Sequence, residues 1–248
     1  MSSYFQNFKK TLYLFGDEKT PVAFQNLSKY VNVIDEVADE ISAYMNYEIR
    51  DFERPDTLSH RLYGSSEYDW TFSLMNDHIR EQGWPLPLQN VYRLGTQDLY
   101  RDWTCILDIS TADSAAEFAS KYAKDQEVLL NGKLMKVKYK NLQLGEITVY
   151  SPRYDPDSDL SGRTVLSYTD GSETIALKNT VNEYNGTYHY VDSANEPVDY
   201  FFDDISAKIP VTNLEKLVEE NNKLKTIRVI KRELIGNVVG QFKTLTGL

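Results

Sequence analysis

Cysteine and histidine are scarce in this chain of 248 residues, which has one cysteine and three histidines. A single cysteine, Cys105, excludes an internal disulfide bond and a zinc site built from several thiolates. His60, His78 and His189 leave little for metal binding or acid–base catalysis. The composition therefore points away from disulfide-bonded proteins and zinc-cluster proteins.

Long apolar runs and an excess of positive charge are also missing. No apolar run is long enough to span a membrane. The N-terminus, MSSYFQNFKK, lacks the apolar core of a signal peptide, so we expect a protein made and kept in a cytoplasm. The net charge of −10 argues against broad nucleic-acid binding, because phosphate contacts need a basic surface.

The charge is unevenly distributed, since residues 206–248 carry a net charge of +4. A basic tail fits docking onto an acidic protein surface or onto the chain's own body, or simply a solvated helix face. Tyrosine is abundant, with 18 residues, eight of them between Tyr139 and Tyr200. Because tyrosine favours both interfaces and strands, it indicates either a contact surface or strand composition.

The stretch Tyr47–Trp84 organises the rest of the chain. Tyr47–Phe52 alternates like a strand, and Asp56 can cap a following helix by accepting from backbone N–H groups. Gly64 then ends this helix, because glycine adopts the left-handed conformation without steric cost. A second helix begins at a serine, carries Trp70 on its inner face, and ends at an Asn-Asp pair before an extended proline-rich linker.

The flanking segments differ in kind. Helices are predicted over Ile34–Met45 and Ser110–Lys124. Three tight hairpin turns are predicted at Asn131-Gly132, Asp170-Gly171 and Asn185-Gly186, because Asn-Gly and Asp-Gly supply the positive φ angles of type I′ turns. We therefore expect a small antiparallel sheet with many exposed tyrosines in this region.

The C-terminal region reads as helix, strand and helix. Thr212-x-x-Glu215 is a capping box that begins an amphipathic helix, and Thr226–Ile230 is a predicted strand. The last helix carries a wide apolar stripe from Leu234 to Leu245, which either closes the chain's own core or docks on a neighbour.

Candidate chemical sites each have a simpler structural interpretation. Asp155, Asp157 and Asp159 begin like a calcium loop, but leucine stands where that motif needs glycine and glutamate, which favours a solvated acidic loop. Asp56, Ser59 and His60 share one short helix, where adjacent residues point apart, so they do not form a catalytic triad.

The remaining candidates are aromatic or lie at element ends. Trp70 and Trp84 could stack on sugar rings, although Trp70 falls in line with the inner face of its helix and so suits a small core. His78 lies at a helix end, and His189 reads as a surface strand residue. With no convincing catalytic or metal-binding group, the sequence predicts a protein that is not an enzyme and needs no cofactor.

The central stretch resembles a LysM module, whose pattern is carried by Asp56-Thr57-Leu58-Ser59, Tyr63-Gly64 and Leu74-Met75-Asn76. Over about the first hundred residues and the last forty, the chain is also similar to the LysM-like baseplate wedge subunit family of contractile-tailed (T-even-type) bacteriophages. This second resemblance is carried by Arg54-Pro55, Leu62-Tyr63-Gly64, Trp70, Asn76-Asp77, Gly83-Trp84, Tyr4-Phe5, Phe8, Tyr13-Leu14-Phe15, Glu220-Asn221-Asn222-Lys223-Leu224 and Ile227-Arg228-Val229-Ile230.

The residue patterns and the second resemblance together predict an α+β fold, in which a LysM-like βααβ unit has an N-terminal helical and strand arm, an inserted antiparallel β-rich region and a C-terminal helix–strand–helix tail. The β-rich region is predicted from its turn signals alone, because the resemblance does not cover it. The corresponding segments are an aromatic arm and helix at 1–46, the LysM-like domain with its linker at 47–98, the β-hairpin-rich insertion at 99–205 and the docking segment at 206–248.

The same resemblance implies a structural virion protein, a wedge subunit that bridges neighbouring wedges and holds the inner baseplate ring around the hub. Its partners would be the wedge-core heterotrimer, the sheath-initiator subunit and neighbouring copies, with no nucleic acid and no membrane. The interface candidates are Tyr4, Phe5, Phe8, Tyr63, Trp84, Arg228, Ile235, Val239 and Phe242. The alternatives are a LysM glycan-binding (peptidoglycan-binding) module of a tail or cell-wall protein, and a hydrolase that uses the Asp155–Asp159 carboxylates.

Overall fold

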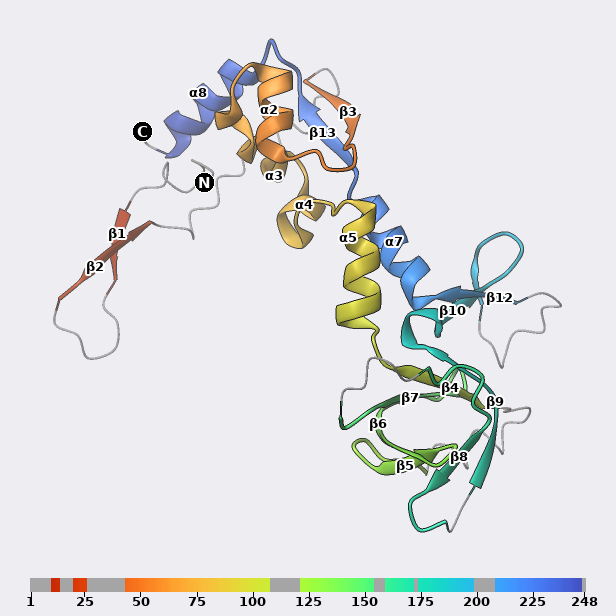
Figure 1. Ribbon diagram of the computed structural model, residues 1–248. Helices are drawn as coiled ribbons and strands as arrows, with labels where there is room; N and C mark the ends of the chain where they lie inside the picture. Colours follow the sequence, from red (N-terminus) through yellow and green to blue (C-terminus); the bar gives the residue numbers. More distant parts are fainter. Residues whose placement is uncertain are drawn as a thin grey trace. The chain divides into compact units, whose positions relative to one another are not determined.

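The computed structural model describes residues 10–13, 20–25, 43–107, 121–153, 159–171, 174–198 and 208–246. The chain is mixed α+β with antiparallel sheets, as the sequence predicted. It divides into two compact units (Figure 1): unit 1 holds residues 1–87 and 221–248, and unit 2 holds residues 88–220. These boundaries differ from those expected at residues 99 and 206, because the segment after the prolines and most of the tail's first helix pack with the β-rich region.

Unit 1 is built on two strands from distant parts of the chain. β3 (Tyr44–Glu48) pairs antiparallel with β13 (Thr226–Ile230) over the full length of both strands. The predicted bounds of β13 are confirmed. The prediction for β3 was wrong, because Tyr44 and Met45, expected at the end of a helix, already belong to the strand. The earlier part of that predicted helix lies outside the described residues.

Four helical segments follow β3: α2 (Pro55–Tyr63), η2 (Ser66–Tyr68), α3 (Trp70–Met75) and α4 (Asp77–Gln82). Pro55 suits the first helical position of α2, where its missing N–H is no loss. Gly64 ends α2 at φ +80°, as predicted. The prediction that Asp56 caps α2 was wrong: Arg54 stands at the cap position and makes no side-chain capping bond, and Asp56 lies inside the first turn. The sequence also gave no sign of α4.

A compact apolar core fills unit 1 between the sheet and the helices. Leu58, Phe72, Ile227 and Val229 are almost completely buried there. From α8 (Ile235–Thr246), Ile235 and Val238 join the same core, so this part of the apolar stripe closes the chain's own fold. A separate hairpin is formed by β1 (Lys10–Tyr13) and β2 (Val22–Gln25).

Asn76 ties α3 to β13. Its side-chain amide donates to the backbone oxygens of Phe72 (2.8 Å) and Arg228 (2.9 Å). Its side-chain oxygen accepts from the Arg228 N–H at 2.7 Å. One buried amide therefore ends a helix and fixes a strand that arrives from 152 residues further along the chain.

Unit 2 opens with α5 (Leu88–Arg93), which continues into the π-helical segment η3 (Leu94–Leu99). Neither was predicted. Six strands then close into an antiparallel barrel in the order β4-β7-β6-β5-β8-β9 (Figure 1). Their bounds are β4 (Trp103–Leu107), β5 (Glu127–Leu130), β6 (Lys133–Asn141), β7 (Glu146–Tyr150), β8 (Val165–Tyr168) and β9 (Thr174–Asn182). The small antiparallel sheet that the sequence predicted is therefore closed into a barrel, and its interior is filled by Leu130, Val137, Ile147 and Leu166, among others.

One of the three predicted type I′ turns is confirmed, since Asn131 (φ +46°) and Gly132 (φ +83°) join β5 to β6. Asp170-Gly171 lies, as predicted, between the paired strands β8 and β9, but only Gly171 has a positive φ there. The third prediction was wrong, because Glu183–Asn185 forms a short 3₁₀ helix, η4. The strand that follows, β10 (Thr187–Val191), pairs with β11 (Pro197–Val198) and β12 (Ile209–Thr212).

Position 186 requires glycine because neighbouring atoms leave no room for a Cβ, and not because of its backbone angle. Its φ is −63°, which any residue can adopt. A Cβ there would lie 2.9 Å from Thr104 Oγ1 and 3.1 Å from the Glu183 carbonyl oxygen. Close packing of the turn onto the barrel explains this residue, and the Asn-Gly pattern alone could not distinguish that cause from a hairpin turn.

The helix α7 (Asn213–Lys223) confirms the predicted capping box. The Thr212 N–H donates to the Glu215 carboxylate at 2.8 Å, and the Glu215 N–H donates back to Thr212 Oγ1 at 3.2 Å. Most of the helix predicted over Ser110–Lys124 lies outside the described residues, and the described part, 121–124, is not helical.

Candidate interaction site

The turn between β3 and α2, residues Arg50–Glu53, combines an exposed aromatic ring with a fixed backbone. The Glu53 N–H donates to the Arg50 carbonyl oxygen at 3.1 Å and closes the turn. Phe52 sits within it at φ +64°, a left-handed conformation that is unfavourable for a side chain with a Cβ. Its side chain is 69% exposed. Phe52 is therefore held outward, contrary to the prediction that it belongs to a strand.

The buried Glu53 carboxylate stabilises the turn through several contacts. Its side chain is only 7% exposed and forms an ion pair with Arg61. It accepts hydrogen bonds from the Tyr47 hydroxyl (2.9 Å) and from the Arg50 N–H (3.1 Å). The Trp84 indole N–H donates to the Glu53 carbonyl oxygen at 2.7 Å. Burial raises the pKa of Tyr47, and the bond to Glu53 adds to that rise. These contacts make the turn a preorganised element.

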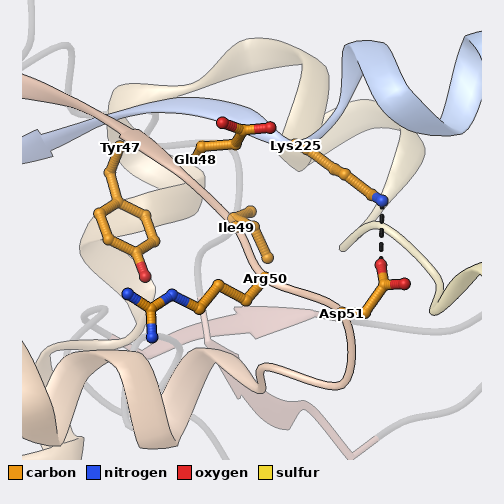
Figure 2. Close-up of a pocket in the computed structure, with 6 residues that line it drawn as sticks. All are labelled: Tyr47, Glu48, Ile49, Arg50, Asp51 and Lys225. Carbon is orange, nitrogen blue, oxygen red and sulfur yellow. Dashed lines mark hydrogen bonds and ion pairs between the residues drawn. The ribbon is translucent and has the colours of Figure 1, made fainter.

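An open pocket of about 600 Å³ lies against the same turn and is lined by Tyr47–Asp51 and Lys225 (Figure 2). Lys225 Nζ bonds Asp51 Oδ1 at 2.9 Å across one end of it. Figure 2 shows the Arg50 side chain extending away from this pair, toward Tyr47. The pocket thus presents side chains of both charge signs, some already paired and some open to solvent.

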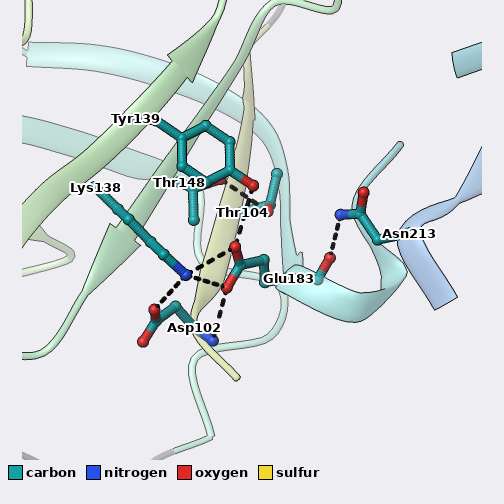
Figure 3. Close-up of polar contacts among 7 residues, drawn as sticks. All are labelled: Asp102, Thr104, Lys138, Tyr139, Thr148, Glu183 and Asn213. Atoms are coloured by element: carbon teal, nitrogen blue, oxygen red, sulfur yellow. Dashed lines mark hydrogen bonds and ion pairs between the residues drawn. The ribbon is translucent and has the colours of Figure 1, made fainter. Parts of the chain in front are cut away.

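Unit 2 contains a second polar cluster, around Glu183 (Figure 3). This side chain is 1% exposed, and its carboxylate accepts from Lys138 Nζ (2.9 and 3.0 Å), from the Tyr139 hydroxyl (3.1 Å) and from the Asp102 N–H (3.1 Å). Lys138 also forms an ion pair with Asp102 at 2.9 Å. Asn213 Nδ2, at the start of α7, donates to the Glu183 carbonyl oxygen at 2.7 Å.

The interactions within this second cluster indicate a structural role. Burial raises the pKa of Tyr139 to about 12. Burial acts to lower the pKa of Lys138, but its bonds to Asp102 and Glu183 outweigh this and raise it. The charged groups bond one another and the backbone, so the cluster joins the barrel to η4 and α7. A buried carboxylate that accepts this many bonds suits a structural role.

The structure describes the side chains of five of the nine predicted interface residues. Tyr63 (8% exposed) and Ile235 (7% exposed) lie in the core of unit 1, so as surface contacts these two predictions were wrong. Trp84 and Val239 pack partly buried against that core. Arg228 is exposed, with its guanidinium carbon 4.9 Å from the centre of the Tyr44 ring.

The other predicted interface residues, Tyr4, Phe5 and Phe8, lie outside the described residues, as does the side chain of Phe242. Of the suggested calcium loop, Asp155 and Asp157 also lie outside them. Within the described ranges, no group of three or more histidine, cysteine or acidic side chains is arranged to hold a metal ion. Among these same residues, no helix is both long and apolar enough to cross a membrane.

Several side chains weighed for chemistry prove to be structural. Ser59 is fully buried, and its hydroxyl donates to the Ser65 carbonyl oxygen at 2.7 Å. Trp70 is 5% exposed, in line with the predicted core position. Burial raises the pKa of Cys105 to about 12, so its thiol is inert inside the barrel.

Sequence reasoning missed the two sites that the structure presents most clearly. Phe52 gave no signal, because a phenylalanine after a strand pattern reads as one more strand residue. Glu183 and Lys138 lie on separate elements, so only the closed barrel brings them together. No model of a known protein family matches the chain, and no curated protein sequence matches it.

Proposed function

We propose that the chain is a structural wedge subunit of a contractile phage tail baseplate, which bridges neighbouring wedges and holds the inner ring around the hub. It acts by binding proteins and not by catalysis. Its partners are the wedge-core heterotrimer, the sheath-initiator subunit and neighbouring copies of the wedge. Its location is the virion, and it is assembled in the host cytoplasm.

One observation carries this proposal: the two separate segments that resemble the wedge family fold together. β3 and β13 pair in one sheet, with α2 and α3 between them in the chain. This order of strand, helices and strand fits a LysM-like unit, with unit 2 inserted between α4 and β13. Asn76, which belongs to the resemblance, makes the bond that joins α3 to β13.

The proposal also fits the distribution of charged and aromatic groups. The turn Arg50–Glu53 presents an aromatic ring on a fixed backbone, an arrangement typical of protein-binding surfaces. The polar cluster around Glu183 forms its ion pairs and hydrogen bonds within the chain. A chain of this kind is suited to hold its shape while others dock on it.

Co-expression with the wedge-core proteins of the same genome tests the proposal. The full chain carries the affinity tag, and a tagged, unrelated acidic protein of similar size is the control. We expect the wedge-core proteins to be retained with the full chain alone, and more weakly when residues 1–9, which include Tyr4, Phe5 and Phe8, are deleted. Failure of the full chain to retain any wedge-core protein would contradict the proposal.

A second function, glycan binding by the LysM-like unit, is favoured by one observation. The open pocket along Tyr47–Asp51 lies next to an exposed aromatic ring, and aromatic rings stack on sugars. Trp84, expected to be the sugar-stacking residue, is instead partly buried and bonded to Glu53. Retention of the full chain on purified peptidoglycan, competed by soluble glycan fragments, would support this function.

A further inference from the structure

We propose that Phe52 and Arg50 are a docking point for a partner protein that offers an apolar pocket flanked by a carboxylate. This inference deepens the proposed function and rests on it, because it names the residues through which the wedge subunit contacts a neighbour. It does not depend on the aromatic N-terminus or on the last helix.

The conformation of Phe52 is the first observation that carries the inference. A left-handed backbone is unfavourable for residues with a Cβ, and phenylalanine has no side-chain hydrogen bond to offset the strain, as asparagine does. Exposure of 69% means that the ring gains little from burial within the chain. The folded unit therefore retains an unfavourable residue that its own packing does not require.

The rigidity of the turn is the second observation. Glu53 is fixed by Tyr47, by Arg61 and by the Trp84 indole. On the other side of Phe52, Asp51 is held by Lys225 at 2.9 Å. A ring presented by a fixed turn loses little conformational freedom on binding, which is the property that makes an aromatic residue an effective anchor.

Arg50 indicates the charge that the partner should carry. Its side chain is exposed, and within the described part of the chain its guanidinium makes no hydrogen bond or ion pair. The other charged groups of the turn are occupied, since Asp51 pairs with Lys225 and Glu53 pairs with Arg61. An unpaired guanidinium in the same turn as the ring favours a partner that offers a carboxylate as well as an apolar pocket.

A protein fits this site better than a glycan does. A sugar needs several converging donors and acceptors for its hydroxyl groups, yet the Tyr47 hydroxyl, Asp51 and Glu53 are already bonded to groups of the chain itself. The Phe52 ring also stands out from the surface, with more than two thirds of it exposed. A projecting ring with one free cation suits insertion into a concave protein surface.

The variant Phe52→Gly separates binding from folding. Glycine adopts positive φ freely, so we expect the denaturation midpoint of the full chain to stay the same or rise. Its affinity for the co-expressed wedge-core complex, measured by biolayer interferometry, should fall about tenfold or more. Arg50→Gln should weaken binding less, and the difference from wild type should shrink at high salt.

Leu142→Ala is the matched control, because Leu142 is a large exposed side chain (43%) in unit 2. It should leave the affinity unchanged. If Phe52→Gly binds within twofold of wild type, this inference is overturned while the proposed function stands. If wild type binds no wedge-core protein, both fail; retention on peptidoglycan that Phe52→Gly abolishes would then reassign the turn to glycan binding.

Discussion

Asn76 shows at the scale of a single residue how unit 1 is held together. Its side chain is buried and makes three hydrogen bonds, two of them to the Arg228 backbone. These bonds satisfy buried or partly buried polar groups, and leaving such groups unpaired costs more than the bonds themselves contribute.

We therefore predict that Asn76→Ala lowers the free energy of unfolding of unit 1 by about 1–3 kcal/mol, because it leaves the buried Phe72 oxygen and the partly buried backbone groups of Arg228 without partners. Urea denaturation followed by tryptophan fluorescence measures the effect. Asn222→Ala removes an exposed asparagine of α7 and serves as the control. A loss below about 0.5 kcal/mol for Asn76→Ala would show that this link is dispensable.

Glu146 makes stability depend on pH in unit 2. Burial at the start of β7 raises its pKa to about 7 from an ordinary 4.5, although bonds from Thr187 act in the opposite direction. Between these values the folded state keeps a proton that the unfolded state has lost. The Glu146 contribution to stability is therefore unfavourable at neutral pH, and it worsens as the pH rises from about 4.5 to about 7.

The variant Glu146→Gln should remove this dependence, because an amide cannot ionise. We expect it to stabilise unit 2 at pH 8 by at most about 3 kcal/mol and to have little effect at pH 4.5. Comparing urea midpoints of variant and wild type at the two pH values cancels the contributions of the other carboxylates. An equal effect at both pH values would contradict the raised pKa.

At the scale of elements, the short helix η4 follows β9 directly and packs closely onto the barrel. Gly186 makes this possible, since Thr104, the Glu183 carbonyl oxygen and Asn213 all lie within 3.3 Å of where a Cβ would stand. A methyl group there would push Asn213 away from its bond to Glu183 and separate α7 from the barrel.

Gly186→Ala should accordingly destabilise unit 2 by about 1–3 kcal/mol through overpacking. Gly240→Ala is the informative contrast, because nothing lies within 4 Å of a Cβ at that position in α8. Alanine in a helix should stabilise by roughly 0.5–1 kcal/mol there. Thermal denaturation of both variants measures the two signs, and a neutral Gly186→Ala would refute the close-packing explanation.

The elements that the sequence predicted well share local signals. The capping box at Thr212, the Gly64 stop and the turn at Asn131-Gly132 each depend on neighbouring residues, and each is present in the structure. Asn185-Gly186 carries a similar local signal, but its structure is determined by the close packing of Gly186 against Thr104 and Glu183. Barrel closure between β4 and β9, by contrast, depends on pairing across distant residues, which a local pattern cannot encode.

The same limit applied to the candidate site. The sequence indicated that Tyr47–Trp84 matters, but not which side chains stay exposed. Tyr63 and Ile235 were expected at an interface and are core residues, whereas Phe52 was expected in a strand and is the most exposed aromatic of those described. Apolar character is visible in a sequence, but whether a given apolar side chain faces the core depends on the tertiary fold.

At the scale of the whole molecule, the two cores are separate. The barrel core of unit 2 runs from Cys105 to Leu177, and the core of unit 1 draws on residues before 80 and after 223. We predict that a fragment of residues 88–224, which keeps α7 whole, folds without unit 1. Amide exchange should show its strands β6 and β7 protected, as in the full chain. A fragment without protected amides would mean that unit 2 needs its neighbour.

We propose that this chain is a permanent structural component of a tail baseplate. Quantitative mass spectrometry of particles purified from the source of this gene tests the proposal most directly. We predict that the chain co-purifies with intact tails, resists removal by high-salt washing, and is present in a fixed ratio to the wedge-core proteins. Its absence from purified particles, or its presence only in the unassembled fraction, would contradict the proposed function.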